Sequence, residues 1–441
     1  MHPVEEVVIT GVGVVSPNGI GRDAYWRALC DGRSGVHALS EFAGQGLPVE
    51  IGGEVADFDP KQYITPRKSL KVMSRVIQLG VTAAELARRD ALLEPGTVDP
   101  ERFGVVMGSD TIYLDPEELS EAYQSCVEDG SFRFDHWGQR ALGEMYPLWM
   151  LKYLPNMPAC HIAIAHDARG PNNTIALAEV SSLLAIAEAM RVIERGQADV
   201  MITGGTGSRI HPLSWIFRDV TQVSQQREQP ERASRPFDVS RDGMVYGEGA
   251  AAFILESRRH ATARRAKVFG RLVSYASTFS PPSNNGVGVG VAVEASINQA
   301  LSRAGLSAAD LGHVNAHGLS TVVHDRVEAQ AIRNALGDVP VTATKSFFGN
   351  LGAGTGAVEM AASLIGMNEG MVPQTINVDR LDPDCPINVV CCQNRAAEKR
   401  MALLLNQAST GQAVAVVIEA EECPSGDGAG GAAETIAGRI F

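Results

Sequence analysis

Long hydrophobic runs, paired cysteine motifs and an excess of positive charge are all missing from this sequence. No apolar segment reaches the roughly 20 residues that cross a bilayer, and no basic segment followed by an apolar stretch indicates a signal peptide at the N-terminus. The seven cysteines contain no CxxC pair, so we expect neither a disulfide framework nor a metal site. The formal charge of −13 argues against a nucleic-acid-binding surface. These absences indicate a reduced, cytoplasmic protein without a membrane span.

The composition is that of a large folded protein with many tight turns. Of its 441 residues, 45% are hydrophobic, 20% are charged and 45 are glycines. Short apolar runs predict buried strands at 7–15, 103–107, 200–203, 251–255, 268–275, 313–316 and 414–419. Amphipathic segments between them predict helices at 73–89, 182–195, 291–304, 327–336 and 357–368. This alternation predicts an α/β protein whose mixed sheets are covered by helices on both faces.

An arginine-rich stretch, residues 258–267, divides the chain into two parts of similar strand–helix order. We therefore expect an N-terminal half over 1–257, a C-terminal half over 258–423 and a glycine-rich tail over 424–441. No close sequence repeat relates the two halves.

The segment around Glu179 is the most informative part of the chain. It reads GPNNTIALAEVSS over residues 170–182, and the helix that follows ends before Gly196, as is typical of a glycine-terminated helix. A buried strand that ends in two glycines comes next. Further motifs stand elsewhere in the chain: TGVGVVSP at 10–17, RPFD at 235–238, RDGMVYGEGA at 241–250, NAHGLST at 315–321 and TKSFFGN at 344–350.

In their order and approximate spacing, these motifs resemble those of the β-ketoacyl-acyl-carrier-protein synthases, the ketosynthases of the thiolase superfamily. The resemblance extends from the first strand to about residue 420. It implies a thiolase-like fold of two similar halves, with mixed sheets layered between helices in αβαβα order. It also implies a dimer, either with a cysteine-bearing ketosynthase or with a second copy. The other implied partner is an acyl carrier protein with its phosphopantetheine-linked acyl chain, and no cofactor or metal is implied.

The resemblance assigns positions in the catalytic site. Glu179 stands where the family has the cysteine that carries the acyl chain. His317 matches the first catalytic histidine, Lys345 matches the family lysine, and Asn350 stands at the second histidine. Asp325 and Glu328 would form a supporting network around His317. We expect Glu179 to lie near His317 and Lys345, at a helix N-terminus that favours a carboxylate.

Three departures from the family pattern bear on the chemistry. Glutamate cannot form the ordinary cysteine thioester. Asn350 can donate a hydrogen bond to an oxyanion, but it cannot take or give a proton. The family's glycine-phenylalanine-glycine-glycine gate is replaced by NQASTGQ at 406–412, so the phenylalanine gate is missing.

Other sites are less well supported by the sequence. Gly11-Val12-Gly13 is not a full GxGxxG, so we do not expect a dinucleotide site. His317, His324, Asp325 and Glu328 lack a second ligand cluster, and a hydrogen-bonded network is the simpler interpretation. A basic run comprises Lys61, Arg67, Lys68, Lys71 and Arg75. This run is either a solvated helix face or a docking surface for an acidic carrier protein.

Four functions are compatible with these patterns. The first is a non-condensing partner subunit, similar to the chain-length factors of type II polyketide systems. The second is a malonyl-carrier decarboxylase, because decarboxylation needs enolate stabilisation but no nucleophile. The third is an acyl-modifying enzyme that uses Glu179 as a general acid or base. The fourth is a scaffold for acyl-carrier domains.

Overall fold

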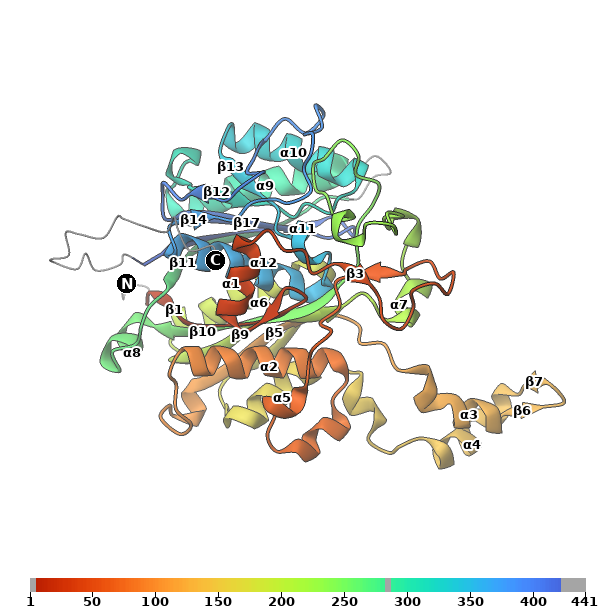
Figure 1. Cartoon of the computed structure of the whole chain (residues 1–441). Coiled ribbons are helices and arrows are strands. Elements are labelled where there is room, and N and C mark those ends of the chain that lie inside the picture. The colour runs from red at the N-terminus through yellow and green to blue at the C-terminus, as the bar shows by residue number, and fades with distance from the viewer. Residues whose placement is uncertain (1–4, 282–286, 422–441) are drawn as a thin grey trace, which may run out of the picture.

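The computed structural model describes residues 5–281 and 287–421, so the tail expected at 424–441 lies outside the described residues. Its strands form two stacked sheet halves with helices between them and on both outer faces (Figure 1). The expected α/β fold, with mixed sheets layered between helices, is confirmed.

The first sheet half comes from the N-terminal part of the chain. Its strands, in spatial order, are β1 (Val7–Ser16), β10 (Glu248–Ser257), β9 (Val200–Ser208), β5 (Phe103–Ser109) and β8 (Asn172–Ala176), with β2 (Gly19–Ile20) beside β1. The β1–β10 and β10–β9 pairs are antiparallel, whereas β9–β5 and β5–β8 are parallel. The edge strand β8 is largely exposed, and the residues around Glu179 follow it directly.

The second sheet half repeats this arrangement in the C-terminal part. Its strands, in spatial order, are β11 (Gly270–Phe279), β18 (Gln412–Ala420), β17 (Met401–Gln407), β12 (His313–Asn315), β13 (Pro340–Thr342) and β15 (Asn388–Val389). Again two antiparallel pairs are followed by parallel ones. The halves join where β1 meets β11, through the pairs Val8–Arg271 and Ile9–Gly270.

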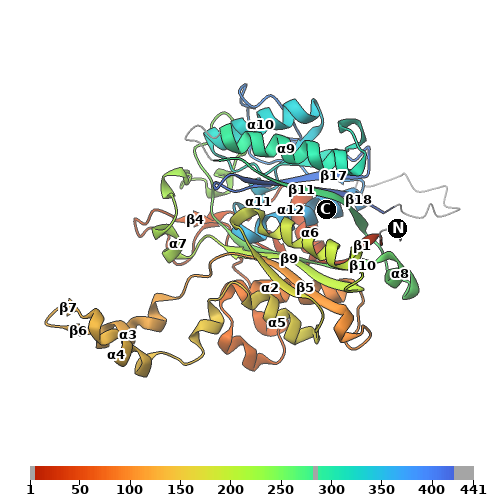
Figure 2. The same cartoon turned by 180° about the vertical axis from the view of Figure 1, so that it is seen from behind.

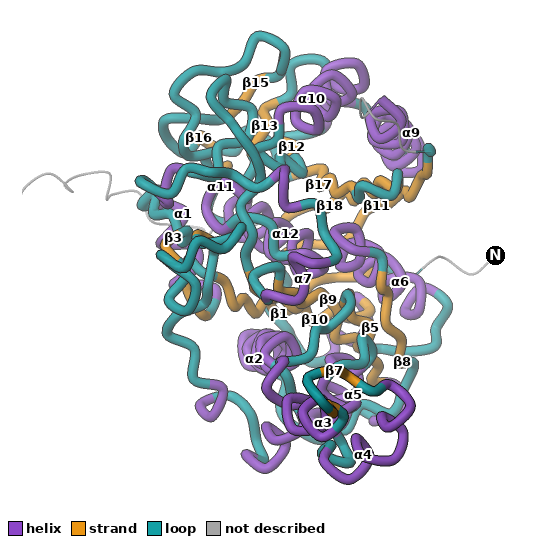
Figure 3. The backbone as a smooth tube through the Cα atoms, turned by 90° about the vertical axis from the view of Figure 1, so that its right-hand side faces the viewer, coloured by secondary structure: helices purple, strands orange, loops and turns teal. Residues whose placement is uncertain are grey.

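Three helix layers complete the fold (Figure 3). The middle layer holds α6 (Ser181–Glu194) and α12 (Thr355–Asn368), with α1 (Arg22–Cys30) beside them. One outer layer holds α2 (Arg75–Asp90) and α5 (Met157–His166), and the other holds α9 (Val287–Ala304) and α10 (Val322–Leu336). Every residue of α12 from Thr355 to Met367 is buried, as is expected of a helix that is apolar on all sides and packs between two sheets.

Shorter elements connect the layers. They are α3 (Ser120–Ser125), α4 (Trp137–Glu144), α7 (Pro212–Ile216), α8 (Arg258–Ala263), α11 (Lys345–Phe348), β3 (His37–Ala38), β4 (Ile51–Gly52), β6 (Val127–Glu128), β7 (Ser131–Phe132), β14 (Met371–Val372) and β16 (Arg395–Ala396). Of these, α3, α4, β6 and β7 form an arm, residues 111–156, that projects from the body beside α5 (Figure 2).

The glycines of the opening motif have a packing role. A Cβ atom on Gly11 would lie 2.2 Å from the carbonyl oxygen of Ala87, and one on Gly13 would lie 2.0 Å from that of Ala83. Both carbonyls belong to α2, which therefore packs directly against the β1 backbone. Close helix–strand approach explains this Gly-Val-Gly.

The arginine-rich stretch between the halves is ion-paired. Arg258 binds Glu6 at 2.9 Å and Glu421 at 2.8 Å, so it ties both ends of the described chain to α8. Arg264, the residue directly after α8, donates to the fully buried Glu256. This stretch is therefore a fixed ionic junction between the sheet halves.

Candidate functional site

Glu179 occupies a sharp turn between β8 and α6. Ala178 has a left-handed backbone with φ of 50°, which is uncommon for a residue that carries a Cβ atom. The Ser181 hydroxyl stabilises the turn, because it donates to the Ala178 carbonyl at 2.6 Å and accepts from the Leu177 amide at 2.8 Å. This strand–turn–helix geometry places the Glu179 side chain in a pocket at the end of the first sheet half.

The Glu179 carboxylate is held by two donors. Arg209 Nη2 lies 2.6 Å from Oε1, and Asn350 Nδ2 donates to the same oxygen at 3.1 Å. The Arg209 side chain is only 2% exposed, and that of Glu179 is 13% exposed. Asp110 lies 3.5 Å from Arg209 and 3.0 Å from Arg218. Four charges of alternating sign, those of Glu179, Arg209, Asp110 and Arg218, therefore extend from the pocket to the base of the arm.

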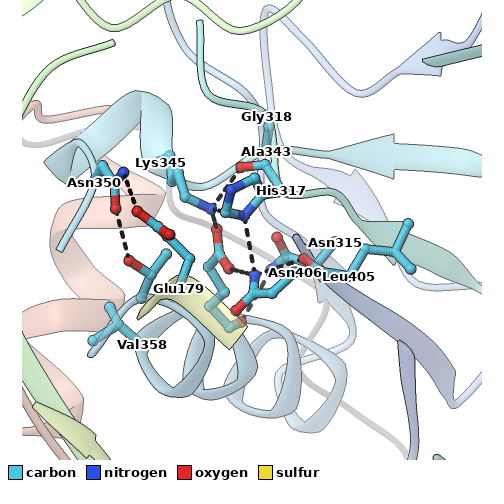
Figure 4. Close-up of polar contacts among 12 residues, drawn as sticks. Glu179, Asn315, His317, Gly318, Ala343, Lys345, Asn350, Val358, Leu405 and Asn406 are labelled. Atoms are coloured by element: carbon cyan, nitrogen blue, oxygen red, sulfur yellow. Dashed lines mark hydrogen bonds and ion pairs between the residues drawn. The ribbon is translucent and has the colours of Figure 1, made fainter. Parts of the chain in front are cut away.

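A second cluster contains His317 and Lys345, each of which follows a parallel strand of the second sheet half (Figure 4). Lys345 Nζ lies 3.0 Å from His317 Nδ1 and donates to the His317 carbonyl at 2.6 Å. It also forms an ion pair with Glu359 of α12. Asn406 Nδ2 donates to Glu359 Oε2 at 2.7 Å and lies 3.3 Å from His317 Nδ1.

These contacts fix the state of the His317 ring. Burial, followed by the charge of Lys345, holds the pKa of His317 well below its usual value, so the imidazole is neutral near pH 7. Two donors, Lys345 and Asn406, face Nδ1, which must therefore be the acceptor nitrogen. The ring proton consequently sits on Nε2, which has no hydrogen-bond partner among the described residues.

Asp325 and Glu328 hold the His317 loop through its backbone. Glu328 accepts from the amides of His317 at 2.6 Å and Gly318 at 2.8 Å, and Asp325 accepts from the amide of Ser320 at 3.1 Å. Burial raises the pKa of Asp325 to about 6 and that of Glu328 to about 8. The donors to both carboxylates are backbone amides, so these side chains position the loop.

The pairing of charges differs from the one expected from the sequence. The cation bound to Glu179 is Arg209, whereas Lys345 pairs with Glu359. The reason is topological, because Arg209 directly follows the buried strand β9 and reaches Glu179, whereas α12 places Glu359 beside Lys345. Asn350 lies with Glu179, and its Oδ1 accepts from the Gly352 amide at 3.0 Å.

The sequence-based reasoning missed Arg209 and Glu359. Glu359 could have been found from the sequence, since it is the one charged residue in a helix that is otherwise uncharged. Arg209 could not have been found in this way, because nothing near it in the sequence indicates its partner.

A cavity of about 230 Å³ opens onto Glu179. Its lining includes Arg209, Arg218, Met244, His324, Asn350 and Gln407. The segment matched to the missing gate forms its rim, because β17 ends at Gln407 and a tight turn at 408–411 leads into β18. Charged and amide side chains therefore surround the carboxylate.

The basic run is divided by the fold. Arg67, Lys68 and Lys71 are exposed on a short 3-10 helix, Arg67–Val72, that precedes α2. Arg75 instead binds the buried Glu248 at 2.6 Å and is not available as a free cation.

Within residues 5–281 and 287–421, no group of three or more His, Cys, Asp or Glu side chains is arranged to hold a metal ion. No helix in this part of the chain is long and apolar enough to cross a membrane.

Two sheet halves of the same strand order, with a buried histidine–lysine–glutamate cluster at the strand ends, define a thiolase-like protein. The chain belongs to the β-ketoacyl synthase family: the model of the Beta-ketoacyl synthase N-terminal domain matches residues 4–261, and that of the C-terminal domain matches residues 270–379.

Relatives cover nearly the whole chain. It is 35% identical to 3-oxoacyl-[acyl-carrier-protein] synthase 2 of Synechocystis sp. over 90% of this chain and 94% of the relative. It is 33% identical to the tetracenomycin polyketide synthase ketoacyl synthase alpha subunit of Streptomyces glaucescens over 92% and 95% of the two chains.

Solved structures agree in fold. A β-ketoacyl synthase from Burkholderia phymatum superposes with a TM-score of 0.84 at 27% identity, covering 95% of this chain and 100% of the other. The ishigamide ketosynthase/chain length factor gives 0.81 at 25% identity, with the same coverage. A type II polyketide ketosynthase in complex with its acyl-carrier protein, AntDE:AntF, gives 0.77 at 27% identity, again with 95% and 100% coverage.

Proposed function

We propose that this chain is a non-condensing partner subunit, of the chain-length-factor kind, for a cysteine-bearing ketosynthase of fatty-acid or polyketide biosynthesis. The observation that carries the proposal is the Glu179–Arg209 ion pair at the position assigned to the acyl-carrying cysteine. A carboxylate that is fixed by a buried guanidinium and the Asn350 amide is a poor nucleophile, and it leaves no thiol there to receive an acyl chain. Glu179 then occupies the position at which an acyl chain would be attached, so no acyl chain is loaded there.

The retained cluster is compatible with a structural role. Lys345 and Asn406 both donate to the buried Glu359 carboxylate. Such a network holds the loops at the strand ends whether or not a reaction takes place. Retention of His317 and Lys345 therefore does not require condensation by this subunit.

The partners follow from the family. A solved relative is a ketosynthase/chain length factor, and another is a ketosynthase in complex with its acyl-carrier protein. We propose the same two classes of partner for this chain, in the cytoplasm. The exposed Arg67, Lys68 and Lys71 supply a positive surface for an acidic carrier protein. A homodimer is the alternative assembly.

Native mass spectrometry of the tagged protein, recovered from its own host, tests the proposal. We expect a heterodimer with a ketosynthase that carries the nucleophilic cysteine. A homodimer without such a partner, recovered under the same conditions, contradicts the proposal.

A malonyl-carrier decarboxylase is the second candidate, and one observation favours it. The unpartnered Nε2–H of the neutral His317 is the kind of donor that stabilises an enolate oxygen. Arg209 offsets the charge of Glu179, which would otherwise repel the malonyl carboxylate. Against it, Asn350 already donates to Glu179. An acyl-modifying enzyme that uses Glu179 as acid or base is the third candidate, because the ion pair with Arg209 leaves the carboxylate less available for proton transfer. A scaffold without a substrate chamber is the fourth.

A further inference from the structure

Two adjacent cysteines lie beyond β15, outside the candidate site. The Sγ atoms of Cys391 and Cys392 are 3.8 Å apart, with Cys392 exposed and Cys391 partly buried. Cys391 pairs with Thr375 in an isolated β-bridge, which fixes one member of the pair. None of the proposed functions uses these residues.

Backbone conformation brings the two sulfurs together. Consecutive side chains of an extended strand point to opposite faces, so neighbouring cysteines normally hold their sulfurs apart. Cys392 has a left-handed φ of 70°, which breaks this alternation. A residue with a Cβ atom rarely adopts that conformation, and such outliers concentrate at functional positions.

We propose that Cys391 and Cys392 form a redox-active dithiol that closes to a disulfide between neighbours when it meets a peroxide. The exposed Cys392 thiolate attacks one peroxide oxygen, the O–O bond breaks, and the departing hydroxide takes up a proton to give water. Cys392 is now a sulfenic acid. The Cys391 sulfur attacks the Cys392 sulfur, the S–O bond breaks, and hydroxide leaves with the Cys391 proton as a second water. The two sulfurs have lost two electrons, and the peroxide has gained them.

The resulting disulfide is readily reversed. A trans peptide fixes the Cα atoms of neighbouring residues about 3.8 Å apart, which is shorter than the roughly 4.4–6.8 Å of ordinary disulfides. Strained and exposed disulfides have the more oxidising potentials and are the labile ones. A thiol reductant therefore restores the pair, as a switchable site requires.

The other described cysteines do not compete for this chemistry. Cys126 and Cys385 are buried, and Cys30 and Cys160 are partly buried without a sulfur contact to another described cysteine. The position assigned to the family's reactive thiol is occupied by Glu179. Burial raises the pKa of Cys391, which leaves the exposed Cys392 sulfur as the first to meet an oxidant.

The test is mass spectrometry of the full chain after treatment with an equimolar amount of hydrogen peroxide. Free thiols are alkylated, and the protein is digested without reductant. Trypsin releases residues 381–395, which also contain Cys385, and fragmentation before Pro386 separates that cysteine from the pair. We expect the 386–395 fragment to lose the mass of two hydrogens, to resist alkylation, and to recover both thiols after dithiothreitol.

Cys392→Ser must abolish the loss of two hydrogens, and Cys160→Ser, a partly buried cysteine away from the pair, must leave it unchanged. The proposal is overturned by a fragment that keeps two alkylatable thiols, or by one that carries added oxygen in place of the disulfide. It is also overturned by a bond from either cysteine to Cys385 or to a second chain. The wild-type measurement decides these outcomes even where a variant fails to fold.

Discussion

Arg209 and Glu179 form a buried ion pair, 2.6 Å between Nη2 and Oε1, that joins the end of β9 to the turn before α6. The pair has two consequences. It fixes the side chain that the sequence resemblance assigns to the family's nucleophile position, and it makes the stability of each charge depend on the other. An ion of either sign left alone in this environment would carry a large desolvation cost.

Arg209→Met is expected to reduce the free energy of unfolding by about 3–5 kcal/mol, because it leaves the Glu179 carboxylate buried without its cation. Urea unfolding followed by circular dichroism measures the loss. The matched control is Arg333→Met, whose ion pair with Asp338 is exposed at both ends, 45% and 77%, and contributes about 1 kcal/mol at most. Adding Glu179→Gln to Arg209→Met should recover part of the loss. Equal losses at Arg209 and Arg333 would contradict the buried-pair interpretation.

Glu179→Cys alone is not expected to restore condensation. Asn350 cannot exchange a proton, the gate at 406–412 is missing, and Arg209 loses its carboxylate. Mass spectrometry of carrier-bound products, after incubation with acyl-carrier and malonyl-carrier substrates, should detect no β-ketoacyl product above background. Efficient condensation by this single variant would show that Asn350 and the gate matter less than argued.

Glu179→Gln separates the two leading functions. A decarboxylase should form more acetyl-carrier from malonyl-carrier once the negative charge is removed, because the Arg209 guanidinium is then released from Glu179 and can attract the malonyl carboxylate. A partner subunit should form none in either form when assayed alone. We expect the second result. Acetyl-carrier formation by the wild type that rises in the variant would instead support decarboxylation.

Glu256 should make stability depend on acid pH. Burial alone would raise its pKa, but hydrogen bonds from Arg264, His260 and Thr10 outweigh burial and lower the pKa from 4.5 to about 2. Its contribution of roughly 3 kcal/mol is therefore fully present above pH 4.5 and is lost as the pH falls towards 2. Urea unfolding between pH 5 and 2 should show a smaller decline in Glu256→Gln than in the wild type. Parallel declines would contradict the assignment.

Charge reversal on the 3-10 helix tests the carrier-protein surface. Lys68→Glu with Lys71→Glu should weaken binding of the acidic carrier by at least about tenfold at low salt, and the difference should shrink at high salt. Surface plasmon resonance with immobilised carrier protein measures it. Arg265→Glu, a basic position on the linker after α8, serves as the control and should leave binding unchanged. An equal effect at both places would argue against a defined docking surface.

The elements that follow periodicity were predicted well from the sequence. The strands at 103–107 and 200–203 and the helix at 182–195 correspond to β5, β9 and α6, with ends that differ by a few residues. The predicted helix at 327–336 begins five residues earlier, at Val322, because its first turn exposes the apolar Val322 and buries the polar Asp325, the reverse of the apolar spacing expected of a helix. The arm at 111–156 was not anticipated, since its short helices lack a long amphipathic pattern.

The site was predicted less completely, for a physical reason. The motifs identify which loops carry Glu179, His317 and Lys345, and these loops do lie at strand ends. The choice of ion-pair partner depends on tertiary contacts such as β9 with the turn before α6, which no local pattern records. Arg209 therefore became visible only in the structure.

The same ion pair sets the order in which sequence changes can accumulate. A lone change of Glu179 to an uncharged residue leaves the buried Arg209 guanidinium with only the more distant Asp110, at 3.5 Å, and a lone change of Arg209 leaves the Glu179 carboxylate without its cation. Either single change therefore gives a less stable protein. A thiol at position 179 therefore has to be introduced together with a compensating change at Arg209, and stability rather than chemistry limits such a substitution made one residue at a time.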